Sequence, residues 1–456
     1  MKPSRRQLLS HAAAGFAMPA LAQLMMNEEV SGSSATSSPL PAKIKRVIFL
    51  FMYGGPSSID TFDYKPQLAR DHGKPLPFEK PRVQFRDTKN LFRSPWKFRQ
   101  YGDSGTWVSE LFPHVTRHVD RLTFVHSLYG SNAAHGGALL KIHTGSDTFV
   151  RPSMGAWISY GLGTENSNLP AFVTIDPTLN HGGVQNFGAS FLPAQHQGVR
   201  VHGKVATIND LVPSSPVAVQ AKKLALLRRL NRQQFADAGP ELSLDARIKS
   251  FELAFRLQRE APEAIDLGSE SQTTHALYGT DSERTAAFGR QCLLARRLAE
   301  RGVRFIQCTH REGESITWDD HSNLVKHHPK LAEAVDKPIA GLLTDLQQRG
   351  LLEDTLVMWG GEFGRTPTAE GNDGRDHNPH GFTWWLAGGG LKPGVHFGAT
   401  DEYGYYAVQD RVHIHDLHAT LLYLMGLDHE QLTYRYSGRD FRLTDVHGRV
   451  VREILS

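Results

Sequence analysis

The chain has 456 residues, of which 40% are hydrophobic and 21% are charged, so it can bury a sizeable core and is neither a disordered chain nor a polytopic membrane protein. The formal net charge is +4, and three of the 51 basic residues lie in a segment that resembles a removable leader, which leaves 48 − 47 = +1. No nucleic acid and no acidic lipid is therefore expected as a bulk electrostatic partner. Two cysteines are too few for a disulfide scaffold, whereas 23 histidines indicate metal or proton chemistry.

The N-terminus has the pattern of an export signal over residues 1–22. Basic residues at positions 2–6 precede an apolar stretch of about 15 residues and a small-residue cleavage site at residues 20–22. That stretch is short for a membrane span, so no stable span is expected, with an uncleaved N-terminal anchor as the alternative. Residues 4–9 resemble a twin-arginine signal, which implies the twin-arginine export machinery and a periplasmic or secreted protein. Residues 23–42, rich in Ser, Gly and Pro, read as a flexible linker.

Short apolar runs follow the linker at intervals. Val47–Met52 is unbroken and apolar before a glycine pair, as expected of a strand buried on both faces. Further strands are predicted at Leu122–Val125, Ala171–Ile175, Val303–Gln307 and Thr355–Trp359, and an edge strand at Thr383–Leu386.

Helical patterns separate these strands. Apolar residues recur at helical spacing over residues 244–255 and 331–346, and residues 281–301 form a strong helical pattern closed by a glycine. The alternation predicts an α/β fold, a three-layer α/β/α sandwich with a mostly parallel sheet. We expect one domain over residues 43–456, with a helical insertion or cap at residues 217–280.

Polar residues follow the predicted strands at their carboxyl ends, which is where open α/β sheets bind ligands. The side chains expected to line one pocket there are His135, Asp319, His321, Glu362, Asp376 and His377. Carboxylate oxygen and imidazole nitrogen bind divalent ions, so the pattern predicts one or two ions of Zn, Mn, Ca or Fe. Candidate ligands are Asp319 and His321, two positions apart, and Asp376, His377 and His380 within one short segment. Asp319 and His377 should lie within roughly 8 Å of each other if they share a metal site.

Four residues are candidates for catalytic roles. Arg365 and Arg375 are suited to holding an oxyanion bidentately. His135 is a candidate metal ligand, general acid/base or nucleophile. Ser57, at a glycine-rich strand end, is a second candidate nucleophile, with turn capping as the alternative.

Several longer motifs resemble one family, the exported bacterial proteins of the domain of unknown function 1501. They are Arg151–Trp157, Trp318–His321, Gly361–Pro367, Gly374–His377 and Gly398–Glu402, within a likeness that runs from about Ile44 to Ser456. That family is grouped with the alkaline phosphatase-like superfamily of sulfatases and phosphatases. The resemblance implies an α/β/α fold with one or two metals at the strand ends.

The resemblance also implies roles for particular residues. Asp319 and His321 would match an aspartate and a histidine that bind one metal, Glu362 would stand at the second metal, and His377 or His380 would match a late histidine ligand. Two departures are visible. Tyr53-Gly54-Gly55 replaces the usual aspartate after the first strand, and His135 stands where the usual nucleophile is expected.

These observations predict an exported, metal-dependent hydrolase of phosphate or sulfate esters without the usual Ser, Thr or formylglycine nucleophile. Neither Cys292 nor Cys308 has the sequence context for conversion to formylglycine. The substrate would be a small-molecule or polysaccharide ester. The alternative is a non-catalytic exported binding or scaffold protein on the same fold.

Overall fold

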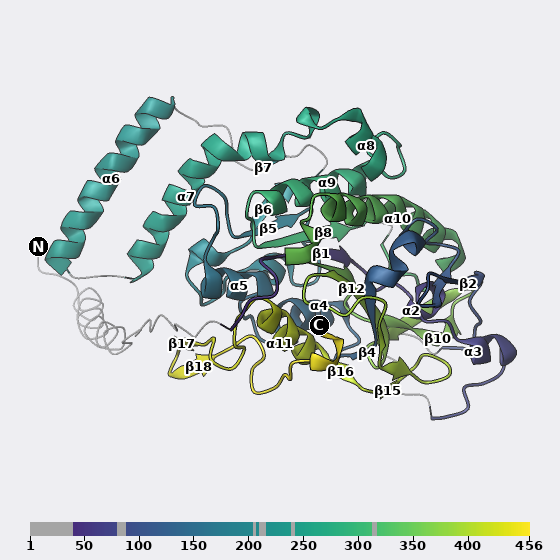
Figure 1. Cartoon of the computed structure of the whole chain (residues 1–456). Coiled ribbons are helices and arrows are strands. Elements are labelled where there is room, and N and C mark those ends of the chain that lie inside the picture. Colours follow the sequence, from purple (N-terminus) through teal and green to yellow (C-terminus); the bar gives the residue numbers. More distant parts are fainter. Residues whose placement is uncertain (1–39, 80–87, 204–206, 209–215, 239–241, 312–316) are drawn as a thin grey trace, which may run out of the picture.

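A central sheet lies between two layers of helices in the computed structural model of this chain (Figure 1). The structure describes residues 40–79, 88–203, 207–208, 216–238, 242–311 and 317–456. The predicted signal at residues 1–22 and nearly all of the predicted linker lie outside the described residues.

The main sheet has ten strands and is mostly parallel, as predicted. Nine strands follow the order β13 (His396–Phe397), β4 (Leu122–Tyr129), β12 (Phe382–Gly388), β9 (Thr355–Gly360), β1 (Arg46–Met52), β8 (Phe305–His310), β5 (Phe172–Ile175), β6 (Val199–His202) and β7 (Thr207–Ile208), and β16 (Val412–His413) pairs with β4. Only β12 and β7 run antiparallel to their neighbours in this sheet. The prediction of an edge strand at Thr383–Leu386 is wrong, because β12 lies between β4 and β9.

Strand β1 supplies both faces of the core. Val47, Phe49 and Phe51 belong to one hydrophobic cluster, whereas Ile48 and Leu50 belong to the other. Side chains of a strand alternate between faces, so an unbroken apolar run is what a strand covered on both sides requires. One face is covered by α9 (Ala286–Glu300) and α10 (Leu324–Gln348), and the other by α4 (His135–Thr144), α5 (Met154–Leu162) and α11 (Ile414–Leu424). The three-layer α/β/α architecture is thereby confirmed.

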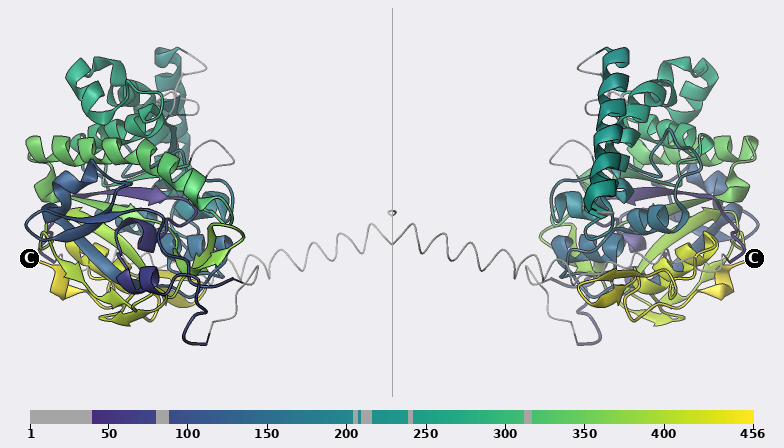
Figure 2. Two further views of the ribbon diagram at one scale, coloured as in Figure 1. Left: turned by 90° about the vertical axis from the view of Figure 1, so that its right-hand side faces the viewer. Right: turned by 90° about the vertical axis from the view of Figure 1, so that its left-hand side faces the viewer.

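Residues 217–280 are largely helical. They contain α6 (Val217–Ala238), α7 (Leu242–Ile265) and α8 (Gln272–Tyr278), and α6 stands at the outside of the molecule (Figures 1 and 2). Helix α9 begins later than predicted, because residues 281–285 form turns before it. Among the described residues, no helix combines the length and apolar character that crossing a bilayer requires.

Two strands outside the main sheet shape its carboxyl edge. β10 (Gly364–Glu370) and β11 (Gly374–Asn378) form an antiparallel hairpin that follows β9 in the chain. Other short elements are α2 (Ser58–Thr61), α3 (Pro66–Arg70), β2 (Phe98–Tyr101), β3 (Thr106–Ser109), β14 (Ala399–Thr400), β15 (Ala407–Gln409), β17 (Tyr434–Tyr436) and β18 (Arg439–Phe441).

Candidate metal centre

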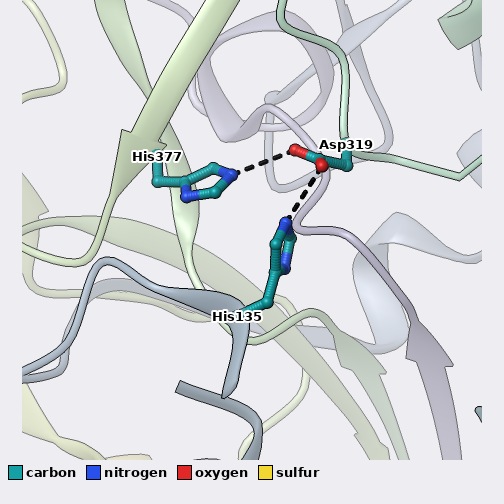
Figure 3. Close-up of side chains that lie close together, drawn as sticks. All are labelled: His135, Asp319 and His377. Carbon is teal, nitrogen blue, oxygen red and sulfur yellow. Dashed lines mark hydrogen bonds and ion pairs between the residues drawn. The ribbon is translucent and has the colours of Figure 1, made fainter. Parts of the chain in front are cut away.

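Three segments that are far apart in the sequence meet beside the carboxyl end of β1. His135 is the first residue of α4, Asp319 and His321 follow β8, and His377 lies on β11 (Figure 3 shows His135, Asp319 and His377). The side chains of Asp319 and His321 are 28% and 30% exposed, so the cluster is open to solvent on one side. The sheet edge thus presents one partly open group of ligand-type side chains.

The ring nitrogens of three histidines converge on the Asp319 carboxylate. Nε2 of His321 and Nε2 of His377 lie 2.9 Å and 3.0 Å from Asp319 Oδ1. Nε2 of His135 lies 3.1 Å from Asp319 Oδ2, and the Nε2 atoms of His321 and His377 are 3.1 Å apart. The separation of Asp319 and His377 is well inside the limit expected for a shared metal site.

The other ring nitrogen of each histidine contacts an acceptor. Nδ1 of His135 lies 2.7 Å from Glu362 Oε1, Nδ1 of His377 lies 2.6 Å from the carbonyl oxygen of Ala133, and Nδ1 of His321 contacts Glu370. A carbonyl or carboxylate oxygen only accepts, so each Nδ1 carries the proton and donates it. In a neutral ring, Nε2 then presents its lone pair to the centre of the cluster, which is the arrangement of metal-binding histidines and their outer acceptors.

A proton or a metal ion is needed between these groups. A neutral imidazole lone pair and a carboxylate oxygen repel each other unless a proton or a metal ion lies between them. His135, Asp319 and His377 offer one ligand atom each within 4.8 Å of one another. Ligands bound at about 2.0–2.1 Å around a tetrahedral ion are themselves separated by roughly 3.3 Å, close to the observed spacing. The donor set therefore fits a divalent ion.

Electrostatics favour a cation at this position. With the histidines neutral, the carboxylates of Glu362, Glu370 and Asp319 and the guanidinium of Arg365 give a formal local charge of −3 + 1 = −2. Burial lowers the pKa of His377 to about 3, and positive charge on Arg365 and His135 acts in the same direction. For His135, hydrogen bonds to Asp319 and Glu362 outweigh the effect of burial and raise the pKa to about 9, so a proton and a metal would compete for its Nε2.

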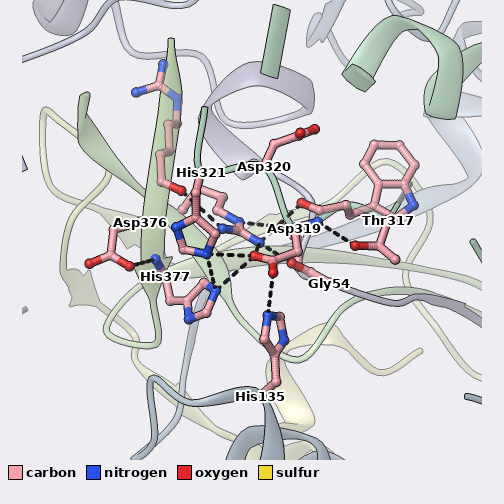
Figure 4. A network of polar contacts seen from close by, with 12 residues as sticks. Gly54, His135, Thr317, Asp319, Asp320, His321, Asp376 and His377 are labelled. Atoms are coloured by element: carbon pink, nitrogen blue, oxygen red, sulfur yellow. Dashed lines mark hydrogen bonds and ion pairs between the residues drawn. The ribbon is translucent and has the colours of Figure 1, made fainter. Parts of the chain in front are cut away.

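A second group adjoins the first. His321, Glu370 and Asp376 also place one ligand atom each within 4.8 Å of one another, and Asp376 Oδ1 accepts the backbone N–H of His377 at 2.7 Å (Figure 4). Burial raises the pKa of Asp376, and the nearby charge of Glu370 acts in the same direction. Since His321 faces both groups, the cluster has ligands for one ion or for two neighbouring ions.

Two predicted ligands have other places in the structure. Glu362 lies behind His135, and its two carboxylate oxygens accept the backbone N–H of Gly54 at 3.1 and 3.2 Å. It orients His135 and belongs to neither candidate ligand group. His380 points elsewhere, with its ring 5.5 Å from that of Tyr406 and 6.2 Å from that of Tyr405.

The predicted oxyanion-binding role of the two arginines is not what their contacts indicate. Arg365 is buried, and its guanidinium donates to the carbonyl oxygens of Gly54, Gly55, Trp318 and Arg375 as well as to Asp319 at 2.7 Å. Arg375 is also buried and binds Asp60 at 2.7 and 3.2 Å, with further bonds to the carbonyl oxygens of Thr366 and Phe92. Both guanidinium groups are engaged by the protein itself, so they brace the turn after β1 and the β10–β11 hairpin.

Ser57 is buried against the same network rather than exposed as a nucleophile. Its hydroxyl donates to Asp60, whose other partner is Arg375. Burial opposes ionisation of Asp60, but the Arg375 guanidinium and these hydrogen bonds lower its pKa overall. The turn-forming interpretation of Ser57 fits these contacts.

Three residues of this region escaped the sequence-based prediction. Glu370 lies opposite Gly374 in the hairpin and binds His321. Its position between the motifs Gly361–Pro367 and Gly374–His377 was the sequence feature that could have identified it. Tyr53 donates or accepts a hydrogen bond with His181 Nδ1 at 2.8 Å, and the His181 ring stacks on His135 with centroids 5.1 Å apart. No sequence pattern marks His181, which has the left-handed φ of +48° that few residues adopt.

Gly54 is a position where a side chain would disrupt the site directly. Its φ is +109°, and a Cβ atom would lie 2.5 Å from the backbone nitrogen of Asp319. The glycine that replaces the expected aspartate therefore allows the Asp319 backbone to approach β1.

The chain belongs to the family described as proteins of unknown function, DUF1501, whose model matches residues 44–455. Comparison with curated proteins found no match. Similar solved structures include the lipoteichoic acid synthase LtaP from Listeria monocytogenes, with a TM-score of 0.39 and 10% identity over 91% of this chain and 78% of that chain. The alkaline phosphatase of the Antarctic bacterium TAB5 has a TM-score of 0.36 and 10% identity over 85% of this chain and 99% of that chain. The sulfatase PsFucS1 from Pseudoalteromonas sp. has a TM-score of 0.35 and 12% identity over 84% of this chain and 68% of that chain. These likenesses are too distant to assign an activity.

Proposed function

We propose that this member of the DUF1501 family is an exported, metal-dependent hydrolase of phosphate or sulfate esters. The observation that carries the proposal is the convergence of three imidazole Nε2 atoms on Asp319, each backed by an acceptor at Nδ1. Such a set of oriented donors has a clear use as a metal centre and little use as a packing device. The ester is that of a small molecule or of a polysaccharide.

The side chains of the cluster would divide the work. His135, Asp319, His321 and His377 would hold the ion, with Glu370 as the outer acceptor of His321 and Asp376 beside them as a ligand for a second ion. A divalent ion held there would supply Lewis-acid activation of the ester and of water. Glu362 fixes the ring of His135, and the ring of Tyr53, whose hydroxyl contacts His181, has its centroid 6.0 Å from that of His135. Hydrolysis by water needs no side-chain nucleophile, which agrees with the engagement of Ser57 by Asp60.

Export rests on the sequence of residues 1–22 and is part of the proposal. N-terminal sequencing of the protein recovered after export tests it. Cleavage after Ala22 is the expected result, and an intact leader on protein held at the membrane would favour the N-terminal anchor.

The decisive experiment is metal analysis by mass spectrometry of untagged protein purified after export, beside the double variant Asp319→Ala/His321→Ala. We expect about one or two equivalents of Zn, Mn, Ca or Fe in the parent chain and almost none in a folded variant. The loaded protein is then screened with phosphate and sulfate esters. Absence of metal, together with failure to take up any of these ions, would exclude the proposed mechanism.

One observation favours the non-catalytic alternative. The guanidinium of Arg365 lies 2.7 Å from Asp319 Oδ1, and its positive charge weakens the attraction of that carboxylate for a cation. A binding or scaffold protein would keep its partner interactions after treatment with a chelator, whereas the proposed hydrolase would lose its activity and regain it with the ion.

A further inference from the structure

Helix α6 holds a disproportionate share of the charge of this protein. Its 22 residues contain five lysines and arginines but one acid, which gives a net charge of 5 − 1 = +4. The whole chain also has a net charge of +4, so all residues outside this helix sum to 4 − 4 = 0. The near-neutral average therefore conceals a strongly basic element.

The same helix exposes large apolar side chains. Val219, Leu226, Leu227 and Leu230 are between 42% and 49% exposed. At 100° per residue, Val219, Leu226 and Leu230 lie within about 40° of one another around the helix axis. They form one narrow apolar stripe along the helix.

This stripe faces away from the rest of the protein. On the opposite side of the helix, Arg228 Nε donates to Glu252 Oε1 of α7 at 2.5 Å, so that side faces α7. The views in Figures 1 and 2 agree that α6 lies at the outside of the molecule, apart from the sheet. A helix within a protein gains most of its stability from packing its apolar side, and none of the described protein covers this side of α6 fully.

Cationic side chains border the stripe on both sides. Lys222 and Arg229 lie on one border and Lys223 on the other, and all three are exposed. Long basic side chains beside an apolar stripe are typical of helices that lie in the interface of a bilayer, because their stems cover apolar surface while their charges reach headgroup phosphates. A second copy packed stripe to stripe would instead bring like charges together.

We propose that α6 docks on an anionic lipid bilayer, with Val219, Leu226 and Leu230 in the interface and Lys222, Lys223 and Arg229 at the phosphates. The helix would hold the folded domain at a membrane surface without crossing it. This inference is independent of the proposed metal chemistry.

The test places a reporter on the stripe of the full chain. A Leu226→Cys variant is labelled with a polarity-sensitive fluorophore, since the native Cys292 and Cys308 are fully buried. Vesicles of phosphatidylcholine alone are compared with vesicles that also contain phosphatidylglycerol. We expect a blue shift of the emission only with the anionic vesicles, and its reversal in high salt. The matched control is Ala225→Cys, exposed on the same helix but about 100° away from Leu226, where the shift should be much smaller.

A charge variant completes the design. Lys222→Glu/Lys223→Glu/Arg229→Glu, made in the Leu226→Cys chain, should abolish the shift while circular dichroism stays unchanged. The proposal is overturned if the anionic vesicles produce no shift, or if Ala225→Cys and Leu226→Cys shift equally. It is likewise overturned by a shift that grows with protein concentration in the absence of vesicles, which would identify a second copy as the partner.

Discussion

The two ends of helix α4 both meet buried histidines, yet the two groups have different chemistry. At the start of the helix, His135 belongs to the cluster around Asp319. At the other end, His415 Nε2 and His418 Nε2 donate to the carbonyl oxygens of Gly145 and Ile142 at 2.7 and 2.8 Å. Carbonyl groups in the last turn of a helix lack partners within it, so these histidines satisfy them and fasten α4 to α11.

The direction of the lone pairs separates a metal centre from a packing device. In the Asp319 cluster, protonated Nδ1 atoms point outward to acceptors and Nε2 atoms point inward. In the other group, the protonated Nε2 atoms bind carbonyl oxygens, and the Nδ1 atoms of His415 and His418 have no hydrogen-bond partner in the part of the chain that the structure describes. A count of histidines does not distinguish these cases, whereas the acceptor behind each ring does.

The largest effect should come from Asp319→Asn. The change keeps the shape of the side chain but removes the negative charge at the centre, so we expect metal affinity and ester hydrolysis to fall by more than about 100-fold. Metal content and activity are measured side by side. His418→Gln serves as the control and should retain the metal. Retention of full metal content in Asp319→Asn would show that Asp319 is not a metal ligand.

Loss of an outer acceptor should have a smaller effect on the same property. Glu370→Gln and Glu362→Gln each weaken the orientation of one histidine, so metal affinity should fall by about 10–100-fold. Competition with a chromophoric chelator measures the affinity, and the exposed Glu353→Gln is the matched control. Unchanged metal affinity in both variants would show that Glu370 and Glu362 do not contribute to metal binding.

The other end of α4 should respond in stability and not in metal binding. His418→Leu leaves the carbonyl oxygen of Ile142 without its donor, so the free energy of unfolding should fall by about 1–3 kcal/mol. Urea denaturation measures this loss, while the metal content per molecule should match that of the parent. Loss of metal from His418→Leu would contradict this prediction, because it would show that the two ends of α4 depend on each other.

Acid should destabilise the protein through the same packing histidines. Burial lowers the pKa of His418 to about 3 and that of His415 to about 4, with nearby positive charge such as Lys141 and His413 acting in the same direction. The unfolded chain binds these protons near pH 6.5, so stability is present above that pH and is lost as the pH falls toward 4. Each such histidine adds a slope of up to about 1.4 kcal/mol per pH unit. Urea titrations at several pH values should show a smaller slope for His418→Leu, and identical slopes would contradict this.

The smallest effect is expected for Ser57→Ala. If the hydroxyl serves only Asp60, hydrolysis should stay within about threefold of the parent and stability should fall by about 1 kcal/mol. Steady-state kinetics on an ester found in the screen provide the measurement. A loss of several orders of magnitude would restore Ser57 as the nucleophile.

The fold was predictable from sequence because its signals are local. The apolar run of β1 indicates a strand covered on both faces, and helical spacing indicates α10. The place of β12 inside the sheet was not predictable, since its antiparallel pairing depends on the path of the intervening β10–β11 hairpin.

The gathering of these side chains was predictable from residue type and position, but their orientation was not. Strand ends indicated where Asp319 and His321 gather, since parallel strands share one carboxyl edge, whereas His377 reaches that edge on β11 of the hairpin. Whether Glu362 contacts an ion or a histidine, and whether Arg365 faces solvent or backbone, depends on a rotation of each side chain that no sequence pattern encodes.

The long sequence separation between His135, Asp319 and His377 has a consequence for folding. An unfolded chain cannot hold these residues together, because large loops would first have to close. An ion would therefore bind the native state alone and stabilise it by about 4 kcal/mol at a thousandfold excess over its Kd. It would act as a clamp across α4, the segment after β8, and β11. Depletion of the ion would then shorten the lifetime of the protein toward heat and proteases as well as stopping its chemistry.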